Sequence, residues 1–499
     1  MKLIETRFDN FRCFKQYDLK YAPETTVFIG KNGTGKSSVL SGIRRGLSFM
    51  FAKPKNYKKN LAISNNAKVR SYGKDEANFD AIERVYNYPI NNSFKASFIG
   101  RELNWEMVKR TQNGGYASTY YKDVVSFILD YYNSVVQAQL PLLAVITDSY
   151  PHQMVNLGTK VKKIINSDIL PRDLAYYGWD ERTNCIELWL TRFYKVSDFE
   201  KDLNDEIRAV ESQIRLWEAR LDFSDETDNH NSNSRLSIKN IQTTISRLNE
   251  RLRYLHSDER SEAFNKERLF IENKLFEFTK PVSDDFNFIN KEFELFRIAV
   301  NRLDKKNYTL EFNFKDGRVI TFESLPMGYR RVFSMVIDIA YRSYILNQGI
   351  ESEGVVLIDE IELHLHPTLQ QDVLKRLRQV FPNIQFIVTT HSPLVISNFK
   401  SDDNNKIIKL EHDGNDYYND KVENIYGIDY NTGLTEIMGA KYRETELEKL
   451  IDSIVILTKF GKTEQANKIK EELIDIAGEN NKYLNDEINK RLKQNSKAN

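Results

Sequence analysis

The stretch Gly30-Lys31-Asn32-Gly33-Thr34-Gly35-Lys36-Ser37 decides the fold of this chain, because it matches the pattern G-x-x-x-x-G-K-[ST]. Its three glycines let backbone N–H groups curve around a phosphate, and a helix that begins after the stretch would add the positive end of its dipole. The apolar run Val-Phe-Ile at 27–29 precedes it, and apolar residues with helical spacing follow over 39–50. Strand, loop and helix therefore occur in the order that a phosphate-binding loop requires.

The residue types of this loop predict how it would hold a nucleotide. We expect Lys36 to reach the β and γ phosphates and Ser37 to place its hydroxyl on Mg²⁺. The predicted nucleotide-binding residues of the loop are Gly30, Lys31, Asn32, Gly33, Thr34, Gly35, Lys36, Ser37 and Ser38. The alternative, a glycine-rich turn that binds no phosphate, is disfavoured by the strand before the loop and the helix after it.

A second strand-like run, Gly-Val-Val-Leu-Ile at 354–358, ends in two carboxylates, Asp359 and Glu360. Open α/β sheets bind ligands at the carboxyl ends of their strands, so we expect both acids beside the phosphate loop. Asp359 would hold Mg²⁺ through its shell of water, and Glu360 would orient and deprotonate the attacking water. The alternative is a pair of surface acids, which the phosphate loop in the same chain disfavours.

A third apolar run, residues 383–390, ends in His391. A neutral imidazole there could hydrogen-bond the γ-phosphate or the attacking water. A histidine after a strand more often has a structural role, but its place one strand after the acids favours a part in catalysis. We therefore predict Glu360 and His391 as the catalytic residues, and Ser37 and Asp359 as the metal-binding residues.

Size and composition limit the other possibilities. A chain of 499 residues is too long for one core and suggests about two to four structural units. No stretch approaches the ~20 apolar residues of a membrane-spanning helix, and the first residues do not resemble a signal peptide. Two cysteines, Cys13 and Cys185, cannot form a disulfide framework, which predicts a reducing, cytoplasmic location. A net charge of +1 leaves any DNA contact to a local basic patch or to a partner.

The chain alternates between nucleotide chemistry and helical segments. We predict the first lobe of an ATPase head over 1–198, where short aromatic-rich runs favour antiparallel strands, and an inserted helical arm over 199–282. The second lobe would cover 283–430 and include a β-hairpin around Asp316-Gly317, followed by a helical region over 431–499. Those last helices could pack on their own head or form a docking surface for another protein, and the residues favour neither. A lysine-rich segment over 53–75 is predicted to lie on the surface, either as a solvated loop, which a charge run favours, or as a patch that touches phosphate.

Two heptad patterns predict that the arm is an antiparallel coiled-coil hairpin. Apolar residues step by three and four from Leu203 to Leu221, and again from Ile238 to Leu255. The polar tract 222–237 between them has the composition of a turn. Each arm would be only about 30 Å long at about 1.5 Å per residue. The alternative is two core helices of an α-helical subdomain, because a coiled coil is usually assigned only from longer patterns.

Leu325-Pro326-Met327-Gly328 stands directly before a helical pattern and resembles the signature loop of ATP-binding-cassette ATPases, usually written LSGGQ. In that family the loop lies at a helix N-terminus and grips the γ-phosphate of a nucleotide bound to the other subunit. The resemblance implies that these four residues contact the nucleotide. Here Pro326 replaces a serine and Met327 replaces a glycine, so a hydroxyl and an N–H are lost, while Gly328 and the helix dipole remain.

The order of phosphate loop, helical insertion, signature loop, paired acids and histidine resembles the head of the SMC, RecF and overcoming-lysogenization-defect ATPases. Residues 10–14, Asn-Phe-Arg-Cys-Phe, look like their N-F-R-x-F strand, which adds Arg12 to the nucleotide-binding residues. The resemblance implies an α/β fold, namely an ABC-type P-loop ATPase head with an antiparallel β lobe, an inserted coiled-coil hairpin and a helical C-terminal tail. It also implies ATP and Mg²⁺ as cofactors, and an ATP-sandwiched homodimer with two composite sites.

Several patterns narrow the choice within these ATPases. His364 and His366 suggest a metal site, but four-coordinate sites need more ligands, and the segment resembles the one that follows the paired acids in this family. The arm tip has no Cys-x-x-Cys, which disfavours the zinc-hook repair ATPases. The sequence after His391 lacks the acidic set of a built-in Toprim nuclease.

The length, the short insertion, the Leu-Pro-x-Gly-Tyr signature and the helical tail are similar to the PtuA family of ATPases from Septu antiphage systems, some of which are carried with retrons. That resemblance implies an ATP-dependent sensor and scaffold that controls a separate PtuB-like HNH endonuclease, within a homo-oligomer of head dimers that contacts nucleic acid as a complex and no membrane. The alternatives are a RecF/SMC-like DNA repair clamp and the ATPase of a PARIS-like defence system with a Toprim effector. A transporter subunit is the weakest, because the arm would have no purpose there.

Overall fold

The computed structural model describes most of the chain, which forms two compact units, residues 1–427 and residues 428–499. The described residues are 1–52, 69–120, 122–133, 139–147, 158–180, 186–227, 232–257, 259–281, 293–302, 308–347, 349–414, 416–423, 425–440, 445–477 and 486–492. Most of the lysine-rich segment, part of the predicted arm tip and Cys185 lie outside these ranges.

A six-stranded sheet forms the centre of the first unit, with the strand order β16-β15-β3-β14-β13-β9. The strands are β3 Thr25–Ile29, β9 Leu142–Ile146, β13 Gly354–Ile358, β14 Ile384–Thr389, β15 Asn405–His412 and β16 Tyr417–Val422. All neighbouring pairs are parallel except β15 with β16. Every residue of β3, β13 and β14 is buried, as expected for parallel strands covered on both faces.

This topology brings the sequence motifs to one edge of the sheet. The phosphate-loop stretch follows β3, the paired acids follow β13, and His391 follows β14. Because β14 lies between β3 and β13 and all three run in parallel, their carboxyl ends face the same side.

A five-stranded antiparallel sheet, in the order β2-β1-β6-β7-β8, forms a second layer. Its strands are β1 Lys2–Phe11, β2 Phe14–Lys20, β6 Ile90–Phe98, β7 Arg101–Lys109 and β8 Tyr116–Tyr120. Residues of β6 alternate between buried and half-buried, so one face of the sheet belongs to the core. The short strands β4 Asn78–Asp80 and β5 Val85–Asn87 pair with each other beside it.

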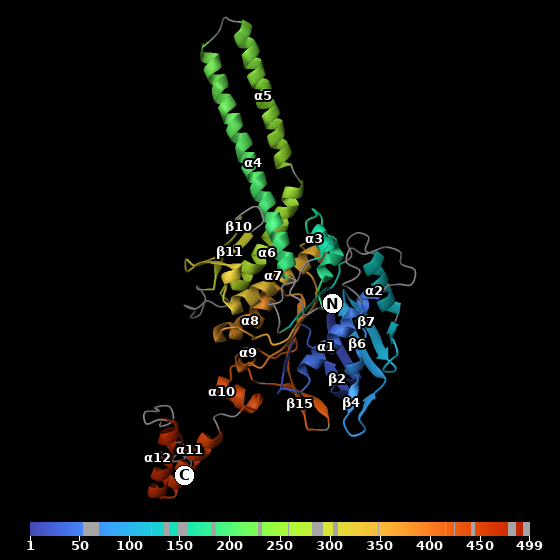
Figure 1. The fold of residues 1–499 in the computed structure, drawn as a ribbon, viewed down its shortest axis with the longest axis vertical. Helices are drawn as coiled ribbons and strands as arrows, with labels where there is room; N and C mark the ends of the chain where they lie inside the picture. The colour runs from blue at the N-terminus through green and yellow to red at the C-terminus, as the bar shows by residue number, and fades with distance from the viewer. Residues whose placement is uncertain are drawn as a thin grey trace. The chain divides into compact units, whose positions relative to one another are not determined.

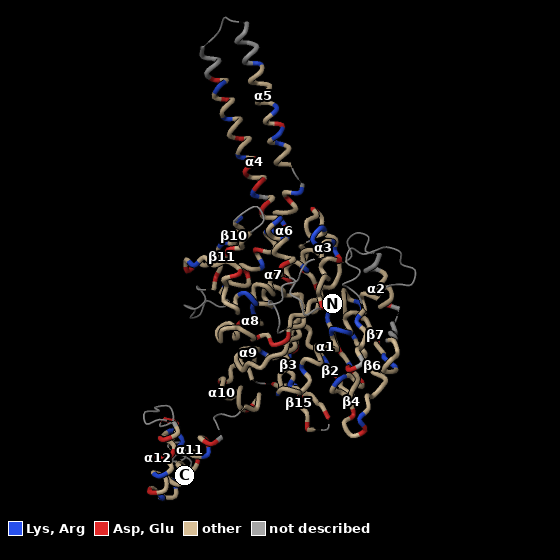
Figure 2. The backbone as a smooth tube through the Cα atoms, in the orientation of Figure 1, with Lys and Arg blue, Asp and Glu red and all other residues tan. Residues whose placement is uncertain are grey.

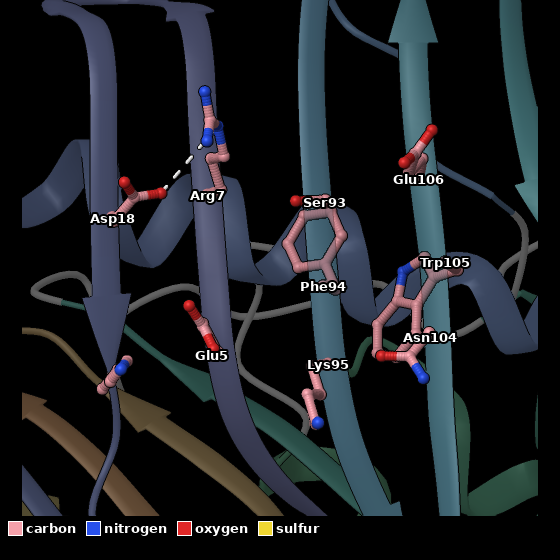
Figure 3. A pocket seen from close by; sticks show the side chains of 10 residues that line it. Glu5, Arg7, Asp18, Ser93, Phe94, Lys95, Asn104, Trp105 and Glu106 are labelled. Atoms are coloured by element: carbon pink, nitrogen blue, oxygen red, sulfur yellow. Dashed lines mark ion pairs between the residues drawn. The ribbon is translucent and has the colours of Figure 1, made fainter.

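The outer face of this sheet has a hollow of about 700 Å³ (Figure 3), lined by charged side chains of four strands. Arg7 contacts Asp9 at 3.2 Å and Asp18 at 3.9 Å, and Lys95 contacts Glu102 at 3.0 Å. The charges of this face therefore compensate one another, as is usual for a solvated sheet surface.

Helix α1, Lys36–Leu47, fills the space between the two sheets and contacts strands of both. Its glycines explain how closely it approaches the antiparallel sheet: a Cβ at Gly42 would lie 2.5 Å from the Phe8 ring, and one at Gly46 would lie 2.2 Å from the Phe94 ring. The Trp105 indole also donates to the Gly46 carbonyl oxygen at 3.0 Å. The second half of α1 is thus packed closely on the antiparallel sheet.

The remaining helices of the head are α2 Lys122–Asn133, α3 Thr159–Ile165, α7 Met327–Asn347, α8 Pro367–Val380 and α9 Pro393–Ser397, with short 3₁₀ turns at Ser48–Phe51, Lys74–Glu76, Arg172–Tyr176 and Phe322–Ser324. A three-stranded antiparallel sheet, β10 Leu295–Arg302, β11 Tyr308–Phe314 and β12 Val319–Thr321, lies in the second half of the head. The hairpin predicted around Asp316-Gly317 is confirmed, since β11 and β12 pair across that turn and Gly317 has a φ of 93°.

Helices α4, Ile186–Thr227, and α5, Ser232–His256, lie side by side as a hairpin (Figure 1), followed by α6, Glu259–Thr279. The hairpin seam contains Leu203, Val210, Ile214 and Leu255, with Phe199, Ile207, Leu248 and Leu252 packed around them. Acids and bases are mixed along α4, whereas the charged residues of α5 are lysines and arginines apart from Glu250 (Figure 2). At about 1.5 Å per residue the 25 residues of α5 span about 38 Å.

The first turns of α4 belong to the head. Trp189 stacks on Tyr341 of α7 and donates from its indole to Asp338 at 2.5 Å. Arg192 forms a buried ion pair with Glu267 of α6 at 2.8 Å. The root of the hairpin is therefore held by polar contacts inside the core.

The second unit is helical, with α10 Tyr430–Thr432, a π-helical turn Gly433–Ile437, α11 Thr445–Lys459, α12 Thr463–Ala477 and a further helical segment at 486–492. It has its own small core of Ile451, Ile454, Leu473 and Ile488. The predicted fold class, an α/β head with an antiparallel β lobe, a helical hairpin and a helical C-terminal region, is confirmed. Within the described ranges, no helix is both long and apolar enough to span a membrane.

Candidate functional site

The phosphate-loop stretch connects β3 to α1 in a conformation that needs its glycines. Gly30, Gly33 and Gly35 have φ angles of 144°, 85° and 95°. A Cβ at Gly30 would lie 2.3 Å from the Leu410 carbonyl oxygen, so the backbone approaches β15 too closely for any side chain. The N-cap of α1 is Gly35, which makes no side-chain capping bond, so the first N–H groups of this helix remain available for an anion.

Lys36 lies inside the loop and is 7% exposed. Its ammonium donates to the carbonyl oxygens of Gly30 at 2.7 Å and Lys31 at 2.9 Å, and the Thr34 hydroxyl donates to the Lys31 carbonyl oxygen at 2.9 Å. The loop is therefore folded around its own lysine. The side chain of Ser37 is exposed.

The pKa of Lys36 connects the loop with the acids that follow β13. Burial lowers this pKa, and the carboxylates of Asp359, Glu360 and Glu362 act in the opposite direction. Three negative charges thus act on the ammonium from the end of the strand two places away in the sheet. This arrangement supplies one cation and several carboxylates at a single edge, as a phosphate and metal site requires.

Asp359 and Glu360 are held by a residue that the sequence motifs did not indicate. The Thr389 hydroxyl, at the end of β14, donates to the Asp359 carboxylate at 2.5 Å and accepts from the Glu360 N–H at 2.8 Å. The backbone N–H of Asp359 donates to the Ile146 carbonyl oxygen at 2.8 Å. A threonine at the end of a buried strand is too common for its sequence position alone to reveal this contact.

His391 is positioned through its backbone. Glu362 accepts a hydrogen bond from the His391 N–H at 2.6 Å and another from the Thr390 hydroxyl at 2.7 Å. The histidine side chain itself is exposed. The turn after the acids and the end of β14 are therefore joined by four side-chain hydrogen bonds, made by Thr389 and Glu362.

Oxygen ligands near the loop fit a hard cation. The Ser37 hydroxyl and the Asp359 carboxylate are the donor types that Mg²⁺ prefers, and Mg²⁺ usually keeps several waters and binds substrate phosphates besides one or two protein ligands. Among the residues that the structure describes, no group of three or more His, Cys, Asp and Glu side chains could hold a metal ion by itself.

The turn at residues 10–14 reaches the phosphate loop, but the Arg12 side chain is bound elsewhere. A Cβ at Gly35 would lie 2.6 Å from the Phe14 ring and 3.1 Å from the Cys13 sulfur. Arg12 pairs with Glu76 at 3.1 Å, and Arg45 pairs with the same carboxylate at 2.8 Å. In this conformation the Arg12 side chain is bound to the 3₁₀ turn Lys74–Glu76.

The predicted signature loop packs against the acid turn of its own chain. Helix α7 begins at Met327, and the Arg330 N–H donates to the Pro326 carbonyl oxygen at 3.0 Å. A Cβ at Gly328 would lie 2.6 Å from the His364 carbonyl oxygen, so the two backbones touch. Leu325 is buried and Met327 is 40% exposed. Pro326 directly precedes the helix. A proline fits this position because no intrahelical hydrogen bond from its backbone nitrogen is needed there.

Arg331, one turn further along α7, lies behind the acids and is fully buried. It donates to the carbonyl oxygens of Thr147, Asp359 and Glu360 at 3.2, 3.2 and 3.1 Å. In the sequence, Arg330 and Arg331 are two positive charges near the start of a predicted helix. Nothing in that pattern indicates that Arg331 is buried.

Comparison with known proteins finds retron ATPases and Septu proteins among the relatives of this chain. The chain is 25% identical over 416 residues to the retron Ec83 probable ATPase of Escherichia coli, which covers 79% of this chain and 69% of the relative. It is 26% identical over 408 residues to the retron Vc95 probable ATPase of Vibrio cholerae serotype O1 biovar El Tor, covering 78% and 70%. A shorter match, 36% over 115 residues, joins it to the Septu protein PtuA of Bacillus mycoides, with 22% of this chain and 16% of that protein covered.

Among solved structures, one match is the Smc head domain of Pyrococcus furiosus with an extended coiled coil, bound to the C-terminal domain of ScpA. The TM-score is 0.42 and the sequence identity is 12%, and the match covers 85% of this chain and 96% of that chain. A family model described as AAA ATPase domain matches residues 1–396. Since this match includes the phosphate loop, both acids and His391, the chain belongs to the AAA ATPase domain family and is an ATPase.

Proposed function

We propose that this chain binds ATP with Mg²⁺ at the edge formed by the phosphate loop and the acids, hydrolyses it, and acts as the sensor and scaffold of an antiphage defence system that controls a separate nuclease. The observation that carries the nucleotide part is the buried Lys36, which lies under the influence of Asp359, Glu360 and Glu362. A lysine inside a glycine loop at a helix N-terminus, facing carboxylates across the sheet edge, fits a triphosphate with a divalent cation.

In this proposal each residue of the edge has one task. Lys36 exchanges its two carbonyl acceptors for the β and γ phosphates, while the free N–H groups at the start of α1 surround the phosphates. Glu360 accepts a proton from the attacking water, and His391 donates to the γ-phosphate or to that water. Ser37 and Asp359 would hold Mg²⁺, which when bound neutralises charge on the β and γ phosphates. Ser38 and the loop backbone complete the cradle.

The proposed complete site needs a second copy of the chain. The signature loop, residues 325–328, would contact the γ-phosphate held by the other head, in an ATP-sandwiched homodimer from which a larger homo-oligomer can be built. The packing of Gly328 on the His364 carbonyl supports this, because it fixes the loop at the start of α7, where N–H groups face outward. With proline at 326, we expect this grip to be weak and hydrolysis to be slow.

The defence role rests on the relatives. Two are retron probable ATPases and a third is a Septu protein. The resemblance to the PtuA family supports a PtuB-like HNH endonuclease as the partner, held or released according to the bound nucleotide, with nucleic acid contacted by the complex.

The nucleotide part is tested with three purified proteins: wild type, Lys36→Ala and Glu360→Gln. Lys36→Ala should lose ATP binding in calorimetry, while Glu360→Gln should bind ATP and accumulate as a dimer in light scattering. Lys20→Ala, which removes an exposed lysine of β2, is the matched control and should behave as wild type. Hydrolysis by Glu360→Gln at the wild-type rate would show that the base is assigned wrongly.

The partner part is tested in cells that carry the chain with its neighbouring genes. We expect a nuclease to co-purify with the chain and phage protection to require both Lys36 and that nuclease. Protection that persists without any nuclease, or tight and salt-sensitive DNA binding by the chain alone, would favour a DNA clamp instead.

A further inference from the structure

The backbone of Glu360 has an unusual conformation. Its φ is 50°, in the left-handed region that residues other than glycine rarely adopt. Such residues persist where surrounding contacts hold them, and they are frequent at functional sites. The contacts that hold this one are therefore part of how the site works.

Hydrogen bonds hold Glu360 from both sides. Its N–H donates to the Thr389 hydroxyl at 2.8 Å, and its carbonyl oxygen accepts from the Arg331 guanidinium at 3.1 Å. Thr389 belongs to β14 and Arg331 to α7, so two separate elements grip the one residue. Both side chains that grip it are fully buried.

Each of the two gripping residues also holds Asp359. The Thr389 hydroxyl donates its single proton to the Asp359 carboxylate at 2.5 Å and accepts from the Glu360 N–H. Both acids together therefore fix the orientation of this hydroxyl. Arg331 donates to the Asp359 carbonyl oxygen at 3.2 Å and to the Thr147 carbonyl oxygen at 3.2 Å. The planar guanidinium thus ties the ends of β13 and β9 to α7.

Arg331 lies one helical turn after the signature loop. Gly328, at the start of the same helix, touches the His364 carbonyl oxygen of the acid turn. Helix α7 therefore contacts the turn that carries Glu360 at two points, and a movement of the signature loop would be transmitted to that turn through a rigid element.

We propose that Thr389 and Arg331 are positioning residues for hydrolysis. They keep Glu360 in its left-handed backbone conformation and so orient its carboxylate toward the attacking water. Because Arg331 lies on the helix that begins at the signature loop, the orientation of Glu360 depends on the position of that loop. This inference rests on the proposed role of Glu360 as the base. Neither residue touches the nucleotide in it: both act on catalysis through Glu360, and their bonds to Asp359 fix the neighbouring acid.

The test uses Thr389→Val, which keeps the shape and removes the hydroxyl, and Thr389→Ser, which keeps the hydroxyl. We expect Thr389→Val to lower kcat about 10- to 100-fold, the usual effect of losing a residue that orients a reacting group, with ATP affinity within about threefold of wild type. Thr389→Ser should retain most of kcat. Arg331→Lys keeps the charge but cannot reach three carbonyl oxygens, and it should act like Thr389→Val.

Thr25→Val is the matched control. Thr25 is fully buried in β3 of the same sheet, and its hydroxyl has no hydrogen-bond partner among the described residues. Its replacement should leave kcat within about twofold of wild type, in line with a buried hydroxyl that makes no contact. If Thr389→Val fails to fold, Thr389→Ala and Arg331→Lys provide the same comparison.

A double variant separates positioning from a general structural role. If Thr389 acts through Glu360, adding Thr389→Val to Glu360→Gln should lower the rate no further, because the group it positions is already gone. Losses that multiply, or a Thr389→Val protein with wild-type kcat, would overturn the inference. Failure of the proposed base is a different result, since Glu360→Gln would then hydrolyse ATP normally whatever Thr389 does.

Discussion

Replacing Glu362 with glutamine should loosen the segment that carries His391. The Glu362 carboxylate accepts from the His391 N–H at 2.6 Å and from the Thr390 hydroxyl at 2.7 Å. Glutamine keeps the shape but has only one acceptor oxygen, which can serve the His391 N–H, and its amide N–H must donate to the Thr390 hydroxyl instead, so both bonds become neutral. Hydrogen bonds to charged groups contribute about 1.5–3 kcal/mol and neutral ones about 0.5–1.5 kcal/mol, so the change costs about 1 kcal/mol per bond and about 2 kcal/mol in total.

Because about 1.4 kcal/mol corresponds to a factor of ten, the segment should open about 30 times more often. Amide hydrogen exchange followed by mass spectrometry measures this directly, in peptides that cover residues 388–393. The exchange of these peptides should rise by that factor, while peptides of β13 stay protected. Glu423→Gln, which removes an exposed acid paired with Lys421 at 2.6 Å, is the control and should change neither.

The same variant has a consequence for catalysis with a defined sign. Glu362 is one of three carboxylates that act on Lys36 beside the phosphate site, so its neutralisation removes repulsion toward a triphosphate. ATP affinity should therefore stay the same or increase, while kcat falls because His391 is less well placed. Unchanged exchange at 388–393, or a loss of ATP affinity with normal kcat, would refute the reasoning.

Three further predictions follow from packing and charge. Gly46→Ala should lower the melting temperature and ATP affinity together, because its Cβ would lie 2.2 Å from the Phe94 ring and push α1 out of place; overpacking of this kind costs about 1–3 kcal/mol. Burial raises the pKa of Glu76, but Arg45 and its other partners outweigh this and hold the pKa below its usual value of 4.5. A carboxylate with a depressed pKa stabilises the fold above its unfolded pKa, so Glu76→Gln should cost stability at pH 7, and urea titrations should show the difference from wild type vanishing as pH falls below about 4.5. Leu473→Ala should cost about 2–5 kcal/mol in the second unit, because it empties part of a core of four buried side chains, and exchange should rise in α11 and α12 without change in β3.

The sequence predicted the parts of the site that are written in short, local patterns. Glycines at 30, 33 and 35 are needed because the backbone there has positive φ, and Lys36 follows them at the start of a helix in the structure as in the pattern. Buried apolar runs before 359 and 391 are parallel strands, and the motifs lie at their carboxyl ends. Local patterns of this kind are readable because the backbone geometry and the chemistry involve neighbouring residues.

The order of strands in the sheet was beyond the sequence. Strand β14 lies between β3 and β13, although it follows both in the chain, and only this order brings the Thr389 hydroxyl onto Asp359 at 2.5 Å. The resemblance placed Arg12 at the nucleotide, whereas the structure pairs it with Glu76, 64 residues away. These contacts come from pairing over long sequence distances, which no local periodicity records.

What the sequence determined by itself is therefore the ATPase family and the residue types of the proposed site: the loop that suits a phosphate, the paired acids and the histidine. What only the tertiary structure decided is the set of hydrogen bonds around these residues, in which Thr389, Glu362 and Arg331 join three elements near Glu360 and His391. The physical reason is that a motif needs particular residue types at a fixed spacing, whereas orientation depends on buried hydrogen bonds between strands and helices that are distant in the chain.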